Sequence, residues 1–454
     1  MLPAAVAAGH PATVAAGIEI LEEGGSAADA AVAACLASCV AETVMTGLLG
    51  GGHAIYWDGD EAWSLDCFVD APSGAGAPPI ELQVPFGEEL VHYAVGPGTC
   101  GVPGLPAGLG ALHQRFGRLP WARLVEPGLR LARSGVTLPP AHAACLAMLA
   151  PVFTLTDEGR DIYAPDGWPL QAGETLHQPG LPGALELLAA EGSRSAYDGS
   201  IAEALLYGVD GVALTQADLE GYRHRWLEPQ AVPYRGMRFL TRAGISGVPE
   251  SLQRLPLLRD LGERGRVHAL LGALDGRGGG GDTTNLVTSD AEGRVCVLTT
   301  SLGLGTGDFL PGFDLHLNSM LGEVDLVREP LRPGERMESM MAPSLALDSD
   351  GVVLGIGAAG GTRLRTALVG VSAGILDERL DPVDAMTRPR FHRAGEVVNA
   401  EPGVDEQALV ELEQQGLHVR RWPAQHHYFG GVSLVAQTGV AGDPRRSGHA
   451  ATLT

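Results

Sequence analysis

The 454-residue sequence contains no lysine, and all 31 of its basic residues are arginine. A protein without lysine cannot form a Schiff base through that side chain and lacks the lysine of a Walker phosphate loop. Acidic residues outnumber the arginines: there are 54 aspartates and glutamates, and the formal net charge is therefore −23. Such a charge argues against nucleic acid or an anionic membrane surface as a partner. No residue pattern calls for a cofactor.

Cysteine is scarce, and none of the six cysteines forms a CxxC pair. Cys35 and Cys39 lie one helical turn apart in an apolar stretch, which favours core packing over a metal site or a disulfide. The first residues have no basic segment of the kind that opens a secretory signal, and no apolar run approaches the length of a membrane span. These observations predict reduced cysteines, no metal, no membrane partner and a cytoplasmic location.

What the sequence does contain is enough chain for a large core, as one large domain or two smaller ones. Residues 13–23 and 27–40 have helical patterns, separated by two glycines and a capping serine at position 26. Strand patterns cluster near both ends of the chain, while helix patterns fill the middle. There we expect one helix over residues 254–274 and a loop at the proline-rich stretch 77–86. This distribution favours α+β layers over a doubly wound parallel sheet.

A run of four glycines at residues 278–281 leads into Asp282, Thr283 and Thr284, and two strand-like segments follow. Consecutive glycines disfavour helix and strand, so we expect a loop here. A threonine hydroxyl becomes a nucleophile when a base lies beside it, and the amine of an N-terminal threonine can serve as that base. Attack of the Thr283 hydroxyl on the Asp282 carbonyl, followed by hydrolysis, would free this amine. The pattern alone also fits an ordinary glycine-rich loop entering a hairpin.

Several further segments occur in the order found in one enzyme family. They are residues 8–33, with Gly24-Gly25-Ser26, the glycine loop at 47–52, Asp282-Thr283-Thr284-Asn285, Ser339-Met340-Met341-Ala342-Pro343, Gly360-Gly361-Thr362-Arg363, Pro389-Arg390-Phe391-His392 and Asp443-Pro444-Arg445-Arg446. Taken together, they resemble the motifs of the γ-glutamyltransferase family of N-terminal-nucleophile hydrolases, from residue 8 to residue 446.

The resemblance implies a four-layer αββα sandwich and self-cleavage before Thr283. A large chain, 1–282, and a small chain, 283–454, would remain associated as one αββα domain, and such pairs could form a dimer. It also implies acyl transfer from a small-molecule amide or γ-glutamyl-like donor to water or an amine. Gly360 and Gly361 would stabilise the oxyanion. Ser301 stands where the family has a threonine that holds the amine of the nucleophile, and Thr299 is a second candidate.

Departures from the family motifs predict a changed donor pocket. Phe68 stands where the family has the arginine that grips the donor carboxylate. Gly322 falls near the position of the acid that binds the donor amino group, with Glu323 one place late. Met340 replaces the second serine after Ser339. A hydrogen bond to a charged group contributes roughly 1.5–3 kcal/mol, so losing both anchors would weaken binding of a γ-glutamyl head by about 10²–10⁴. We therefore expect a more apolar pocket and a donor other than glutathione.

Three functions stay open at this point. The first is a γ-glutamyltransferase-like amidohydrolase or acyltransferase with altered donor specificity. The second keeps the nucleophile but breaks a C–C or another acyl bond in secondary metabolism. The third is an unprocessed, non-catalytic binding protein. Two other patterns are weaker: GxGxxG at 355–360 lacks the second strand of a dinucleotide site, and GxSxG at 370–374 falls inside a helix pattern.

Overall fold

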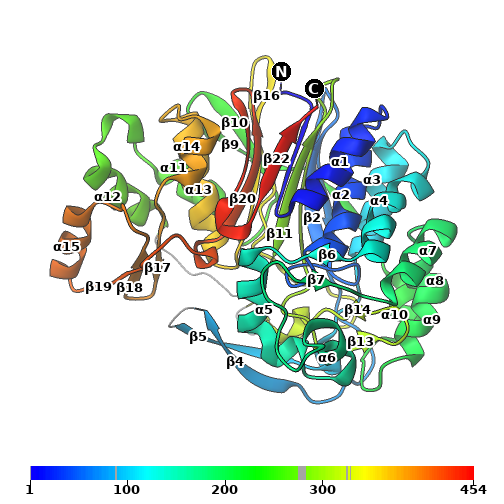
Figure 1. Ribbon diagram of the computed structural model, residues 1–454. Helices are drawn as coiled ribbons and strands as arrows, with labels where there is room; N and C mark the ends of the chain where they lie inside the picture. The colour runs from blue at the N-terminus through cyan, green and yellow to red at the C-terminus, as the bar shows by residue number, and fades with distance from the viewer. Residues whose placement is uncertain (1, 87–88, 275–282, 324–325, 328, 454) are drawn as a thin grey trace.

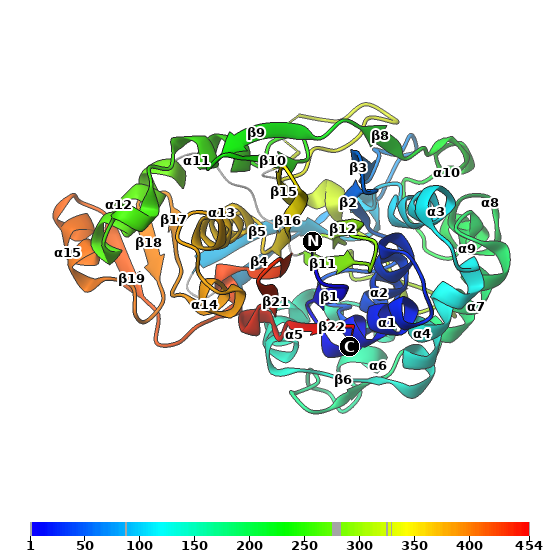
Figure 2. The same cartoon turned by 90° about the horizontal axis from the view of Figure 1, so that it is seen from above.

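The computed structural model describes residues 2–86, 89–274, 283–323, 326–327 and 329–453. Two antiparallel sheets face each other in the centre of the protein, and helices cover the outer face of each sheet (Figure 1). The view from above shows these layers side by side (Figure 2). The arrangement confirms the expected α+β class and the αββα sandwich.

Within the described residues, the first sheet has seven strands. Their order is β22 (His449–Thr452), β1 (Ala5–Ala8), β11 (Thr284–Ser289), β12 (Val295–Ser301), β2 (Gly51–Trp57), β3 (Ala62–Cys67) and β8 (Arg225–Leu227). β11 and β12 form the expected hairpin, in which Thr284 pairs with Thr300. The strand that follows Thr283 therefore lies inside the sheet, between β1 and β12.

The second sheet, counted over the same described residues, has six strands. Their order is β21 (Gly439–Gly442), β20 (Gly431–Ala436), β16 (Gly351–Ala359), β15 (Ser344–Asp348), β10 (Met237–Thr241) and β9 (Gln230–Tyr234). Side chains alternate between the two faces of a strand. In β11, Val287 belongs to the apolar layer between the sheets, whereas Leu286 packs toward the helices. By the same alternation Thr284 faces the helices.

Helices α1 (Pro11–Glu22) and α2 (Ala27–Ala41) cover the first sheet, with α3 (Leu105–Phe116) and α4 (Trp121–Ser134) packed against α2. α2 begins at a capping box, in which the Ser26 hydroxyl accepts from the Asp29 N–H at 3.1 Å and the Asp29 carboxylate accepts from the Ser26 N–H at 2.9 Å. Every residue of α2 is buried. A helix made almost entirely of small and apolar residues can be buried on all sides in this way.

The second sheet is covered by α13 (Arg363–Leu376), α14 (Pro382–Thr387) and α11 (Val248–Arg254). Beyond these helices lie α12 (Glu263–Leu274), α15 (Glu406–Gln414) and a small sheet of β17 (Phe391–Ala394), β18 (Val397–Ala400) and β19 (His418–Arg421). On the opposite side, the outer helices are α7 (Leu181–Glu191), α8 (Ser195–Asp198), α9 (Ser200–Tyr207) and α10 (Gln216–Gly221).

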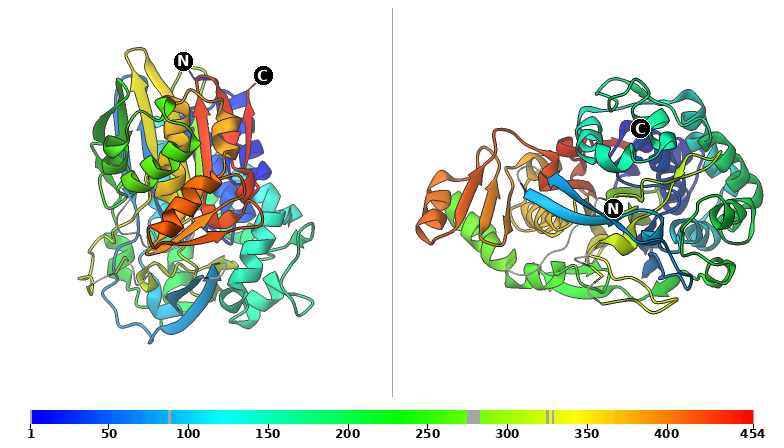
Figure 3. Two further views of the ribbon diagram at one scale, coloured as in Figure 1. Left: turned by 90° about the vertical axis from the view of Figure 1, so that its left-hand side faces the viewer. Right: turned by 90° about the horizontal axis from the view of Figure 1, so that it is seen from below.

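The lower end of the sandwich carries the hairpin of β4 (Ile80–Phe86) and β5 (Glu89–Val95), with α5 (Pro140–Phe153) and α6 (Asp157–Tyr163) beside it (Figure 3). Two-residue strand pairs complete the fold: β6 (Val136–Thr137) with β7 (Thr175–Leu176), and β13 (Phe309–Leu310) with β14 (Leu315–His316).

Some local predictions were wrong. Residues 254–274 were expected to form one helix, but α11 ends at Arg254 and α12 begins at Glu263, because Pro256 cannot continue a helix. The proline-rich stretch at 77–86 was expected to be loop, yet it contains β4. Pro85 is tolerated there because a two-stranded ribbon leaves one edge of each strand without a partner.

Both large sheets mix strands from the two sides of the predicted cleavage point. In the first sheet, β11 lies between β1 and β12, and β12 lies beside β2. In the second sheet, β10 pairs with β15. Strands of segment 1–282 therefore form backbone hydrogen bonds with strands of segment 283–454 in both sheets.

Candidate active site

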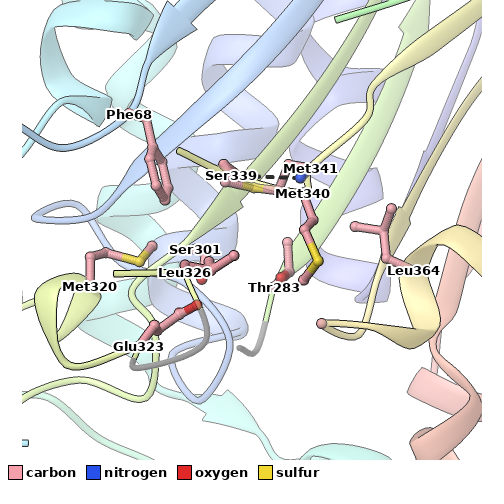
Figure 4. A pocket seen from close by; sticks show the side chains of 11 residues that line it. Phe68, Thr283, Ser301, Met320, Glu323, Leu326, Ser339, Met340, Met341 and Leu364 are labelled. Atoms are coloured by element: carbon pink, nitrogen blue, oxygen red, sulfur yellow. Dashed lines mark hydrogen bonds between the residues drawn. The ribbon is translucent and has the colours of Figure 1, made fainter. Parts of the chain in front are cut away.

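Thr283 directly precedes β11, is 4% exposed, and lines a pocket (Figure 4). In the view of Figure 4, Phe68, Met320 and Glu323 lie on one side of the pocket and Leu364 on the other, with Thr283 between them. The described lining residues are Phe68, Thr283, Ser301, Met320, Glu323, Leu326, Ser339, Met340, Met341, Gly361 and Leu364.

The structure brings most of the predicted site residues to this pocket. Six of them line it: Phe68, Thr283, Ser301, Ser339, Met340 and Gly361. Gly360, Thr299 and Gly322 do not belong to the lining. Asp282, on the other side of the predicted cleavage point, lies outside the described residues.

Six of the eleven described lining residues of the pocket are apolar, Phe68 and Met340 among them, and the others are polar or glycine. Among its described lining residues, Glu323 is the one with a charged side chain. Gly303 allows the carboxylate of Glu323 to approach, since a Cβ on Gly303 would come within 3.3 Å of Glu323 Oε1. A carboxylate in the wall of a pocket is suited to a cationic group on a ligand.

Gly322 lies in a tight turn next to Glu323. Its N–H donates to the Ser319 carbonyl at 2.9 Å, and an added Cβ would overlap the Ala94 carbonyl oxygen. Position 322 therefore has no room for an acidic side chain, and the following residue carries the carboxylate into the pocket. The expectation that both charged anchors are absent thus needs correction: the arginine is replaced by Phe68, but an acid is present.

Phe68 follows β3 and is buried, with its ring centroid 5.3 Å from that of His53. Its N–H donates to the Asp66 carboxylate at 3.0 Å. Asp66 is also paired with Arg336, whose Nη1 lies 2.7 Å from the Asp66 Oδ1. The acid of this segment is thereby held by an ion pair, while the aromatic ring faces the pocket.

Gly360 and Gly361 connect the end of β16 to the start of α13. Their φ angles are +123° and +55°, in the region that favours glycine. The Gly360 carbonyl accepts from the Arg363 N–H and the Gly361 carbonyl accepts from the Leu364 N–H, each at 3.1 Å. These bonds turn the two carbonyls into the first turn of α13. A Cβ on Gly360 would lie 2.7 Å from the Gly430 Cα, so the backbone is closely packed here.

Ser301 and Thr299 were the two candidates for the hydroxyl beside the nucleophile. Ser301 lines the pocket, and its hydroxyl accepts from the Gly303 N–H at 3.0 Å. Thr299 is fully buried outside the pocket and donates to the Asn285 side-chain oxygen at 2.7 Å. The position of Ser301 therefore suits that role better than the position of Thr299.

Ser339 and Met340 belong to a segment that crosses the pocket before β15. The Ser339 hydroxyl accepts from the Met341 N–H at 3.1 Å, and its carbonyl accepts from Arg242 Nη1 at 2.8 Å. Hydrogen bonds therefore hold both the side chain and the backbone carbonyl of Ser339 in place. Met340 and Met341 add flexible apolar surface, which adapts readily to ligand shape.

Patterns outside the pocket belong to the scaffold. Residues 355–359 lie on β16 and residues 370–374 lie inside α13. Among the described residues, no group of three or more His, Cys, Asp or Glu side chains is arranged to hold a metal ion. Over the same part of the chain, no helix combines the length and apolarity needed to cross a membrane. All six cysteines are buried thiols.

A family model described as gamma-glutamyltranspeptidase matches residues 13–274 and 268–453. The chain belongs to the γ-glutamyltranspeptidase family. It is 28% identical to the Acylase ACY 1 proenzyme of Pseudomonas sp. (strain V22), over 95% of this chain and 89% of that protein. It is 24% identical to the Glutathione hydrolase proenzyme of Bacillus subtilis (strain 168), over 98% of this chain and 90% of that protein.

The solved structure of cephalosporin acylase from Bacillus halodurans has the same fold. It superimposes with a TM-score of 0.83 and 22% identity, covering 99% of this chain and 96% of that chain. With relatives that are hydrolases and acylases made as proenzymes, this chain is a γ-glutamyltranspeptidase-like enzyme of amide hydrolysis or acyl transfer.

For this family member, sequence reasoning missed part of the site. Met320, Leu326, Met341 and Leu364 read as ordinary core residues, because an apolar side chain gives no sign that it faces a pocket rather than a neighbour. Glu42, which lies outside the pocket and accepts a hydrogen bond from the Thr284 hydroxyl, was also missed. A lone acid in the apolar run at residues 35–49 was the available signal.

Proposed function

We propose that this γ-glutamyltranspeptidase relative is a self-processing amidohydrolase or acyltransferase whose nucleophile is the Thr283 hydroxyl. The observation that supports this most directly is the place of Thr283 in the wall of the pocket, together with Ser301 and Gly361. A hydroxyl, a second hydroxyl beside it and a glycine backbone are groups that acyl transfer requires.

Self-cleavage would create the base. The Thr283 hydroxyl attacks the Asp282 carbonyl, the ester forms as the peptide C–N bond breaks, and water hydrolyses the ester. The products are chains 1–282 and 283–454. Because both sheets contain strands from each segment, the two chains stay associated after the cut.

In the processed enzyme, the Thr283 amine takes the hydroxyl proton while the oxygen attacks the carbonyl of the donor amide. Backbone N–H groups of Gly360 and Gly361 stabilise the oxyanion. The amine then gives its proton to the leaving nitrogen as the C–N bond breaks. Water or an amine releases the acyl group from the ester, and Ser301 holds the Thr283 amine in place.

The lining of the pocket supports a donor with an apolar acyl group that carries an amino group. The amino group would lie near Glu323, and the acyl chain would contact Phe68 and the methionines. Phe68 offers nothing to a donor carboxylate, so a free γ-glutamyl head is a poor fit. The same apolar lining is compatible with the second possibility, a C–C or other acyl hydrolase of secondary metabolism. A cytoplasmic location and a dimer of chain pairs stay predictions.

The first test is a denaturing gel with mass spectrometry of the purified protein. For the wild type we expect two chains, one that ends at residue 282 and one that begins at residue 283. Thr283→Ala should give a single uncut chain. Thr283→Ser, which keeps a hydroxyl, should still be cut. A wild-type protein that stays uncut would favour the non-catalytic binding protein.

The second test compares p-nitroanilides of γ-glutamate, of leucine and of a fatty acyl group without an amine. We expect the leucyl compound to be cleaved best. A cut protein that releases nothing from any of the three would favour the recruited hydrolase of another bond.

A further inference from the structure

Glu42 is a fully buried carboxylate behind the nucleophile, at the end of α2. It follows Ala41 directly, and its N–H donates to the Ser38 carbonyl at 2.7 Å. The surrounding chain is apolar, so the carboxylate requires hydrogen-bond donors in place of water. It does not line the pocket, and the proposed reaction does not use it.

Two threonine hydroxyls donate to this carboxylate. Thr13 of α1 donates to Glu42 Oε1 at 2.6 Å, and Thr284 of β11 donates to Glu42 Oε2. Residue 9 is glycine where the Thr284-bound oxygen approaches, since an added Cβ would overlap Glu42 Oε2. Three segments far apart in the sequence thus meet at one carboxylate.

The hydrogen bond from Thr284 to Glu42 also affects the orientation of the preceding residue, Thr283. Thr284 faces the helices, while Thr283 lines the pocket. A second bond, from the Thr288 hydroxyl to the Ala27 carbonyl at 2.7 Å, fixes the same face of β11 to the start of α2. Groups at the two ends of one buried helix therefore accept hydrogen bonds from the helix-facing side of β11.

The carbonyl of Thr283 is held as well. Arg446 Nη1 donates to it at 3.4 Å, and the Arg446 guanidinium lies near enough to Glu42 to favour the ionised carboxylate. Arg446 therefore holds the carbonyl of Thr283, and Glu42 holds the side chain of the next residue, Thr284.

We propose that Glu42 is a positioning residue for Thr283: by holding Thr284 it directs the Thr283 hydroxyl toward the pocket, both in self-cleavage and in turnover. This inference rests on the proposed nucleophile. It assigns to a residue outside the pocket the task of keeping the attacking oxygen in a reactive direction, and small displacements of such an atom lower rates strongly.

The test uses the full chain with Glu42→Ala, Glu42→Gln, Thr284→Val and Thr13→Val. Thr13→Val is the matched control, because it removes the other hydroxyl from the same carboxylate and leaves Thr284 in place. The readouts are the first-order rate of self-cleavage of purified precursor, and kcat and KM per cleaved molecule on leucine p-nitroanilide. Thermal unfolding reports folding.

We expect Glu42→Ala and Thr284→Val to lower both the cleavage rate and kcat by about 10- to 100-fold with little change in KM. Glu42→Gln, which keeps one acceptor oxygen, should recover most of the loss. The double variant Glu42→Ala/Thr284→Val should show no larger fall in cleavage rate or kcat than either single variant, because both substitutions remove the same hydrogen bond.

The inference is overturned if Thr13→Val slows both rates as much as Thr284→Val at an equal loss of thermal stability, since Glu42 would then have a structural role only. It is also overturned if Thr284→Val cuts and turns over at the wild-type rate. Failure of the proposed function looks different: Thr283→Ala would still be cut or still be active.

Discussion

Phe68 and Glu323 line the same pocket as Thr283, although one follows β3 and the other follows the turn after Asn318. An aromatic ring and a carboxylate therefore flank the space next to the proposed nucleophile (Figure 4). In the proposed function, the donor would be recognised there by apolar contact and by the negative charge of Glu323. Each of these two residues can be tested separately.

Replacing Phe68 by arginine should restore recognition of a donor carboxylate. A charge-assisted hydrogen bond contributes roughly 1.5–3 kcal/mol, so kcat/KM for γ-glutamyl p-nitroanilide should rise about 10- to 100-fold in Phe68→Arg. The control is Phe68→Leu, which removes the ring without adding a guanidinium. If Phe68→Arg and Phe68→Leu have equal kcat/KM for γ-glutamyl p-nitroanilide, position 68 does not bind the donor carboxylate.

Glu323→Gln should remove the preference for donors that carry an amine. The side chain keeps its size and loses its charge, so kcat/KM for leucine p-nitroanilide should fall about 10- to 100-fold. An acyl p-nitroanilide without an amine should be cleaved at the wild-type rate, which makes the ratio of the two substrates the measurement. A parallel fall for both substrates would mean that Glu323 supports the pocket wall only.

Gly360→Ala should damage both folding and turnover. Its φ of +123° disfavours a side chain, and the new Cβ would lie 2.7 Å from the Gly430 Cα. Strain of this kind costs about 1–3 kcal/mol, and it would displace backbone N–H groups proposed for the oxyanion. Gly370→Ala on α13 is the control, because its Cβ would meet nothing within 4 Å and should not lower stability. Thermal unfolding midpoints and kcat decide; equal values for the two variants would contradict the role of residue 360.

The sequence alone could predict the parts of the fold that depend on local patterns. The helices on either side of Ser26 lie within two residues of the expected bounds, and the hairpin follows Thr283 as expected, because caps and alternating side chains act over a few neighbours. Phe68 could be placed by its motif. Glu323 could not, since the position of its carboxylate depends on the tight turn at Gly322 and the carbonyl of Ala94, which come together only in the folded chain.

The sequence also could not predict that the free energy of unfolding would depend on the protonation of Glu42. Burial, partly offset by the hydroxyls of Thr13 and Thr284 and by Arg446, raises its pKa to about 7 from the ordinary value of 4.5. The folded protein therefore binds this proton more tightly than the unfolded chain does. The stabilisation by the protonated carboxyl is fully present below pH 4.5 and is lost as the pH rises through 7.

Comparison with Glu42→Gln isolates that loss, because glutamine has similar size and does not titrate. One pKa unit corresponds to 1.36 kcal/mol, so the free energy of unfolding of the wild type should fall by about 3 kcal/mol relative to the variant between pH 4.5 and pH 8. Both proteins should carry Thr283→Ala, which keeps each a single chain, and urea unfolding at several pH values supplies the numbers. Parallel stability curves for the two proteins would mean that Glu42 is ionised throughout this range and that its donors compensate fully for burial.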